Sequence, residues 1–202
     1  MIDASNILKS KKKVRKYEKI LIKKIKNYFI NLGFSVIPNA RFNISWGSIT
    51  SDLDLLLLKE NEITIVEVKS KHDTLSRAKN QIKKITDFAD YVYLATDVYP
   101  KKFIEKSIGL IYVTNNGIEV IKDAKKIIKL PDFISVASLQ KKCLLRRLNN
   151  ITSERKDQDK YNIALSYFKK VDKNILKNEL KEIVTCGLKC ELNCPIWKFI
   201  DK

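Results

Sequence analysis

The stretch Ser51–Lys71, SDLDLLLLKENEITIVEVKSK, contains two apolar runs separated by the polar residues KENE. Each run has the length of a buried strand, and the short polar break between them predicts an antiparallel hairpin. Three charged residues interrupt the apolar pattern, namely Asp54 in the first run and Glu67 and Lys69 in the second. Because an unpaired charge is costly to bury, these residues need a chemical explanation.

Pairing across the predicted hairpin brings the two acids together. If the chain turns through Glu60 and Asn61, counting back along both strands places Asp54 directly opposite Glu67. Opposite side chains in an antiparallel pair share one face, with Cβ atoms about 4.5 to 5.5 Å apart, and Lys69 shares that face by alternation. Like charges in this position destabilise a sheet, whereas a divalent cation held between them would reverse the sign of the interaction.

The alternative interpretation is a surface hairpin whose polar face is simply wetted by solvent. The same face carries four aliphatic residues and one further acid: Leu56, Leu58, Ile63, Ile65 and Asp52. Four large aliphatic side chains make a poor solvent face. The pattern therefore favours acids placed in an otherwise buried face.

The elements around the hairpin predict an α/β fold. Apolar residues spaced by three and four predict an amphipathic helix within Ser10–Gly33. Further strands are expected at 34–46, 91–96 and, around an Asn-Gly turn, 109–121, with a helix from about Thr74 between the hairpin and the strand at 91–96. This order implies a mixed central sheet flanked by helices over about residues 1–130. Residues 131–202 are expected to form a helical extension, with helices within 135–148, 158–170 and 174–186.

The composition points to a polyanionic partner. The 202 residues include 40 Lys and Arg against 23 Asp and Glu, which gives a formal net charge of +17. Nucleic acid is the partner this charge favours, and a lysine-rich solvated surface is the alternative. The sequence has no apolar run of membrane-spanning length, and its first residues lack the pattern of a secretory signal, so a cytoplasmic protein without a membrane partner is expected.

The hairpin and its setting resemble the PD-(D/E)xK nuclease superfamily, in particular the Holliday-junction resolvases and DNA-repair nucleases of archaea and their viruses. The matching residues are Asp54 in SDLDLLLL and the Glu-x-Lys pair Glu67 and Lys69 in VEVKS. Glu18 occupies the position of the family's helical Glu, and Gln81 falls where many members carry Gln on the next helix. One departure is Leu53, which stands where the family has its proline. The resemblance spans about residues 10–125 and implies a restriction-endonuclease-like core and a DNA endonuclease active in repair or recombination.

Two of these residues also have ordinary structural interpretations. Glu18 lies at the edge of the helix's inward stripe, where it could instead form an ion pair with Arg15 one turn earlier. Gln81 lies beside Ala78 and Ile82 and could be a partly exposed helical Gln.

Phosphodiester hydrolysis needs a metal that neutralises the phosphate and lowers the pKa of a bound water. Mg²⁺ or Mn²⁺ prefers oxygen ligands, which Asp54, Glu67 and the carbonyl of Val68 would supply. Lys69 would orient or deprotonate the attacking water, and Glu18 could hold a second metal or its waters. The alternative function is a noncatalytic nucleic-acid-binding or partner-binding module on the same fold.

Basic runs on both sides of the predicted core suit contact with a phosphate backbone. The candidate nucleic-acid-binding residues are Lys11, Lys12, Lys13, Arg15, Lys71, Arg146 and Arg147. Such runs are also typical of solvated helix faces. Trp46 could stack on a base or belong to the core, and His72 is expected on a surface loop. A homodimer would let two sites cut two strands, but no segment of the sequence requires one.

The four cysteines, Cys143, Cys186, Cys190 and Cys194, raise a separate question. The last three are four residues apart and would share a face on a continuous helix. Four thiolates suit Zn²⁺ or an iron–sulfur cluster, although the spacing differs from that of cluster-bearing nuclease relatives. Metal binding, one or two disulfides, and free buried thiols all remain open.

Overall fold

The computed structural model describes residues 4–41, 52–60, 62–71, 73, 75–99, 105–139, 141, 144–145 and 159–189. The chain divides into two compact units. The first contains Met1–Ala40 and Leu53–Ile127, and the second contains Arg41–Asp52 and Ile128–Lys202. No helix in the described part of the chain is long and apolar enough to cross a membrane.

Helix α1 (Ala4–Asn31) opens the first unit and packs through residues spaced by four, Leu21, Ile25 and Phe29, all of which are buried. It ends in a Schellman motif at Gly33, close to where the sequence predicts the end of the helix. Gly33 adopts φ +82°, its N–H donates to Ile30 at 2.9 Å, and the Phe34 N–H donates to Phe29 at 3.1 Å. A side chain at Gly33 would be strained at this positive φ, so the glycine sets where the helix ends.

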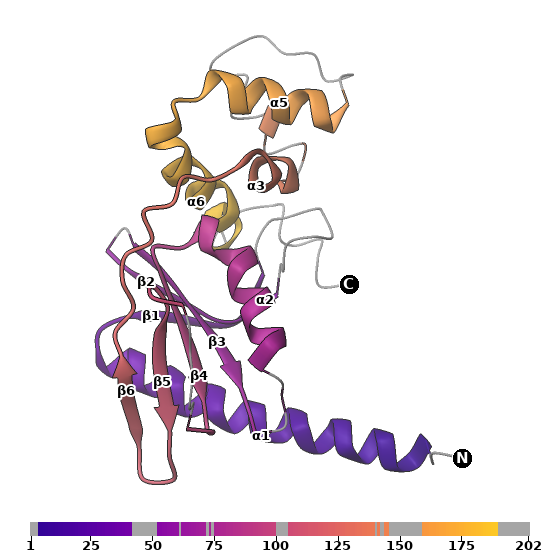
Figure 1. Cartoon of the computed structure of the whole chain (residues 1–202), viewed down its shortest axis with the longest axis vertical. Coiled ribbons are helices and arrows are strands. Elements are labelled where there is room, and N and C mark those ends of the chain that lie inside the picture. Colours follow the sequence, from indigo (N-terminus) through magenta and orange to yellow (C-terminus); the bar gives the residue numbers. More distant parts are fainter. Residues whose placement is uncertain are drawn as a thin grey trace. The chain divides into compact units, whose positions relative to one another are not determined.

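The first unit is built on a six-stranded mixed sheet with strand order β1-β2-β3-β4-β5-β6 (Figure 1). Strands β2 and β3 are antiparallel, β3, β4 and β5 are parallel, and β5 and β6 are antiparallel. The strands are β1 Ser35–Arg41, β2 Asp52–Lys59, β3 Glu62–Lys69, β4 Tyr91–Thr96, β5 Gly109–Val113 and β6 Ile118–Lys122. Helix α2 (Leu75–Ile85) and the 3₁₀ turn η1 (Thr86–Phe88) connect the parallel strands β3 and β4.

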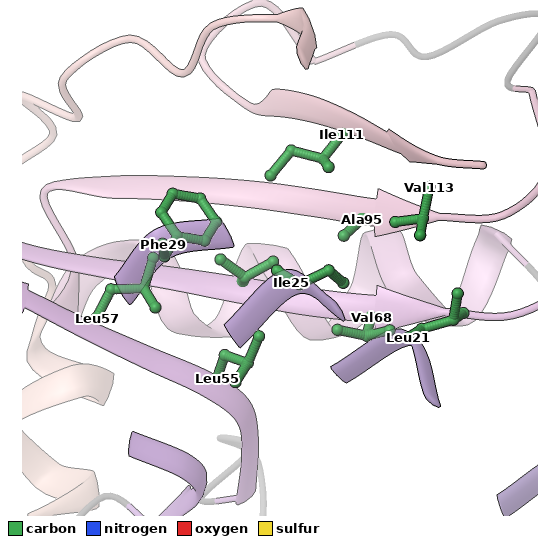
Figure 2. Packing of buried hydrophobic residues seen from close by; sticks show 10 residues of the cluster. Leu21, Ile25, Phe29, Leu55, Leu57, Val68, Ala95, Ile111 and Val113 are labelled. Carbon is green, nitrogen blue, oxygen red and sulfur yellow. The ribbon is translucent and has the colours of Figure 1, made fainter. Parts of the chain in front are cut away.

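The sheet is covered on both faces by helices. Its α1 face presents alternate residues, including Leu55, Leu57, Val66 and Val68, to the buried stripe of α1 (Figure 2). The intervening residues Leu56 and Ile65 are also fully buried, on the opposite face. Helix α2 covers that face with Ala78, Ile82 and Ile85, each at most 1% exposed (Figure 1). The expected α/β architecture, a mixed sheet flanked by helices, is confirmed at this level.

The second unit is helical, with α3 (Phe133–Ser138), α5 (Lys160–Lys170) and α6 (Lys173–Lys189). Phe133 anchors α3 against α5 through edge-to-face contacts with Tyr161 at 5.2 Å and Phe168 at 5.8 Å. The Tyr167 hydroxyl of α5 donates to the Glu179 carboxylate of α6 at 3.1 Å.

The helical segment expected within 135–148 is interrupted at Leu139. Helix α3 ends at Ser138, and Leu139 is extended with φ −64° and ψ 156°. The Ser138 hydroxyl donates to the Ser135 carbonyl at 2.6 Å, which is the local side-chain bond that makes serine a weak helix former.

Candidate active site

The β2–β3 hairpin has the register expected from the sequence. Lys59 pairs with Glu62, and the pairing runs to Leu55 opposite Val66. Glu60 takes the positive φ of 54° that such a tight turn needs. Continued by one residue, the same register places Asp54 opposite Glu67, on the face away from α1. The two acids therefore lie together where the regular pairing ends.

Asp54 is held across the hairpin by the backbone of β3. Its Oδ2 accepts the Val68 N–H at 2.7 Å, and the side chain is half-buried. A charge-assisted bond of this length fixes the carboxylate against the strand that carries Glu67. The sequence had predicted the carbonyl of Val68 as a metal ligand, and the structure adds a role for its N–H.

Glu67 is a buried acid surrounded by other charges. It is 2% exposed, and its Oε1 accepts a hydrogen bond from Lys69 Nζ at 2.5 Å. The pKa of Glu67 is raised from 4.5 to about 7, chiefly by burial and then by the negative charges of Asp54 and, to a smaller extent, Glu18, while Lys69 lowers it. Buried Lys69 compensates only part of the cost of charging Glu67.

Glu18 reaches this group from a different element. It lies on α1, one turn before the buried Leu21, and its charge acts on Glu67 across the sheet end. The residue before it, Tyr17, holds Lys71 just beyond the end of β3, with the ammonium 5.4 Å from the ring centroid. The structure thus brings together Glu18, Asp54, Glu67 and Lys69, with Lys71 exposed beside them.

A turn that was not predicted from the sequence fixes the chain directly after Lys69. The Asp73 carboxylate accepts both the backbone N–H of Ser70, at 3.1 Å, and its hydroxyl, at 2.9 Å. The Asp73 N–H returns a bond to the Ser70 carbonyl at 2.9 Å. The Ser-x-x-Asp spacing after the Glu-x-Lys strand was the available signal. Asp73 is therefore a positioning residue for the end of β3.

Gln81 lies on α2, and its Oε1 is buried without a hydrogen-bond partner. A buried polar atom without a partner needs an explanation in a native fold. An ordered water or a bound ion is one such explanation. This observation separates Gln81 from an ordinary exposed helical Gln, since an exposed amide would be solvated.

The donor set at this site suits a hard divalent cation, because the candidate ligands are carboxylate and carbonyl oxygens. In the described ranges, no three Asp, Glu, His or Cys side chains are close enough as they stand to hold a metal ion. Lys69 occupies one Glu67 oxygen, so the lysine supplies the positive charge in this conformation.

Several predicted residues cannot be placed. Helix α1 contains Lys11, Lys12, Lys13 and Arg15, but their side chains lie outside the described part of the chain. The same holds for the side chain of Cys186 in α6. Trp46, His72, Cys143, Arg146, Arg147, Cys190 and Cys194 lie outside the described residues altogether.

The cysteine prediction can be tested by chemical analysis of the purified protein. If the thiols form a metal site, purified protein should contain zinc or iron by elemental analysis, and Cys190→Ser should release it. Metal binding would also stabilise the helical extension, which the same variant should loosen. Metal-free protein with four titratable thiols would contradict a metal site.

Comparison with known proteins places the chain in a family. Residues 44–192 match the family described as bacteriophage P4 protein cII, and the chain belongs to that family. This description names a phage protein and states no activity. A search of curated proteins found no match. Among solved structures, a protein of unknown function from Silicibacter pomeroyi is 18% identical, with a TM-score of 0.44 over 68% of this chain and 94% of that one.

Proposed function

We propose that the chain is a Mg²⁺- or Mn²⁺-dependent endonuclease of the PD-(D/E)xK type, with a restriction-endonuclease-like core and duplex or branched DNA as substrate. The observation that carries the proposal is the buried Glu67 beside Asp54, Glu18 and Lys69. This arrangement opposes folding, because ionising Glu67 in the folded chain costs more than in water. Strongly perturbed ionisable groups of this kind gather at functional sites.

Asp54, Glu67 and the Val68 carbonyl are the groups that would hold the metal. The ion would neutralise the scissile phosphate and lower the pKa of a bound water. The Asp54 carboxylate is already oriented by the Val68 N–H at 2.7 Å. Orientation of a ligand by a second bond is the usual arrangement at metal sites, so the hairpin is prepared for its ion.

Lys69 has the second role. Lys69 is 5% exposed and its ammonium lies 2.5 Å from Glu67 Oε1, so the side chain is held in place before substrate arrives. In the proposed reaction it orients the attacking water and stabilises the charge that develops on the phosphate. Glu18, whose charge acts on Glu67, would bind a second ion or its waters. No covalent intermediate is required.

A noncatalytic nucleic-acid-binding module is the second candidate. It is favoured by the ion pair of Lys69 with Glu67, which already balances part of the carboxylate charge. Thermal melting during Mg²⁺ or Mn²⁺ titration separates the two candidates. The enzyme should show a rise in Tm that is lost in Asp54→Ala, because a ligand that binds the folded state stabilises it. The binding module should show no Asp54-dependent rise.

Binding should be strongly electrostatic because the chain carries a net charge of +17. Affinity for duplex DNA is expected to fall steeply with salt, and Lys71→Ala should reduce the log-log slope by about one. Lys71 is exposed beside the acids, so it can reach a phosphate without rearrangement of the core. The measurement is fluorescence anisotropy in EDTA over a range of salt concentrations. An affinity that does not change with salt would contradict electrostatic binding.

A further inference from the structure

A second candidate site lies in the first unit at the other end of β3. A hollow of about 400 Å³ opens where the end of α1, the β2–β3 turn and the start of β4 meet the end of β6. This volume is within the range of pockets that hold small ligands. Thr64, which lines the hollow, is five residues from Lys69 on the same strand, a separation of roughly 17 Å. The hollow is therefore distinct from the acidic site.

Its walls are aromatic and mutually braced. The Phe29 ring is at the centre and makes edge-to-face contacts with Tyr28 at 5.3 Å, Phe34 at 5.4 Å and Tyr93 at 6.0 Å. Phe29 itself is 5% exposed and belongs to the core shown in Figure 2, whereas the three outer rings are partly exposed. Because each outer ring packs on a buried one, the outer rings are held in place for a planar ligand.

Polar groups surround these rings. The Tyr93 hydroxyl oxygen accepts a hydrogen bond from the Ala124 backbone N–H, which leaves its own proton available to donate. The neighbouring Asp123 is exposed and lines the hollow with an acceptor carboxylate. A ligand that offers both an acceptor and an amino group would satisfy this pair.

Three charged side chains line the hollow, Lys59, Glu62 and Asp123, and Glu62 is paired with Lys126 at 2.6 Å. The Lys59 ammonium lies 5.1 Å from the Phe34 ring centroid and donates to the Leu32 carbonyl at 3.1 Å. The cation–π position on Phe34 is thus filled by the protein's own lysine, which would repel an organic cation and attract a phosphate.

We propose that this hollow binds a nucleotide whose unpaired base carries an exocyclic amino group. The base would stack on Tyr93 and on Phe34, whose ring the Lys59 ammonium would leave in order to pair with the phosphate, and the amino group of the base would donate to Asp123. Aromatic faces bind bases in this way in single-strand-binding proteins, and carboxylates accept from the amino group of cytosine. The proposal rests on the proposed binding of nucleic acid but not on cleavage.

The test measures binding of 10-mer oligo(dA), oligo(dC) and oligo(dT), and of AMP, to the full chain in EDTA, so that no cleavage occurs. Phe34→Leu keeps an apolar side chain but removes the stacking face, and should weaken oligo(dA) binding between about fivefold and a hundredfold. Asp123→Ala, at an exposed position, should remove the preference for dA and dC over dT. Tyr99→Leu, which removes a 58% exposed ring outside the hollow, is the matched control and should bind as the unmodified chain does.

AMP distinguishes two sources of the same ligand chemistry. If AMP binds and this binding is lost in Phe34→Leu, the ligand is a free nucleotide. If only the oligonucleotides bind, the ligand is an unpaired base of a strand. Both results support the site. Unchanged affinity in both Phe34→Leu and Asp123→Ala would overturn it. A chain that fails to cut DNA but shows these losses would sink the nuclease proposal and leave the nucleotide site standing.

Discussion

Replacement of Asp54 or Glu67 by alanine is expected to reduce metal-dependent cleavage to background. The two carboxylates share one face at the end of the hairpin, so either variant removes half of the carboxylate pair that would bind the metal. Loss of about 4 kcal/mol of transition-state stabilisation corresponds to roughly a thousandfold in rate. The measurement is a cleavage panel of branched, duplex and single-stranded DNA with Mg²⁺ or Mn²⁺.

DNA binding should survive in the same variants. Removing a carboxylate beside the phosphate path relieves repulsion, so Asp54→Ala and Glu67→Ala are expected to bind DNA at least as tightly as the unmodified chain. Lys69→Ala should retain metal binding, followed as a metal-dependent rise in Tm, and should lose turnover. Glu119→Ala, at an exposed position of β6, is the control and should cut normally. Wild-type cleavage by both acid variants on every substrate would show that this pair is not an active site.

The parts of the site that the sequence predicts are those controlled by periodicity. The register of the hairpin follows from the loop length and from alternation, and these two features alone place Asp54 opposite Glu67. The end of α1 was equally predictable, because a glycine after an amphipathic helix supplies the positive φ of a Schellman motif.

The parts that the sequence does not predict depend on individual side-chain conformations. Nothing in the spacing of residues shows that the Asp54 carboxylate would accept the Val68 N–H. The early end of α3 has the same origin, since the Ser138 hydroxyl bonds to a carbonyl in its own helix. Such side-chain bonds differ only slightly in energy from the backbone bonds of regular structure. The spacing of apolar residues therefore does not predict which of the two forms.

The last prediction concerns the stability of the metal-free chain and does not depend on cleavage. In the folded chain the pKa of Glu67 is raised to about 7, against 4.5 for an ordinary glutamate. Below pH 4.5 the carboxyl is protonated in both states and costs nothing. Between these values the unfolded chain ionises first, so the folded chain loses stability as pH rises towards 7. The full deficit, about 3 kcal/mol, is reached above the folded pKa.

Glu67→Gln should remove this deficit, because glutamine resembles the protonated acid in size and carries no charge. In EDTA the variant is expected to unfold with a free energy up to about 3 kcal/mol higher than the unmodified chain at pH 8, and with little difference at pH 4.5. Lys69 does not reverse this sign, because its attraction for the ionised carboxylate is already contained in the raised pKa of Glu67. Denaturant unfolding at the two pH values measures the difference, and Glu119→Gln, at an exposed position, serves as the control.

Added Mg²⁺ should make the unmodified chain more stable than Glu67→Gln at pH 8. A cation bound between Asp54 and Glu67 would repay the cost of ionising the buried acid, so the unmodified chain should gain stability with metal concentration while Glu67→Gln gains little. A Glu67→Gln chain that is destabilised equally at both pH values would contradict the buried, proton-retaining acid. A chain that follows the predicted pH dependence but ignores Mg²⁺ would keep the buried acid and favour the noncatalytic module, with Lys69 as the permanent counter-charge.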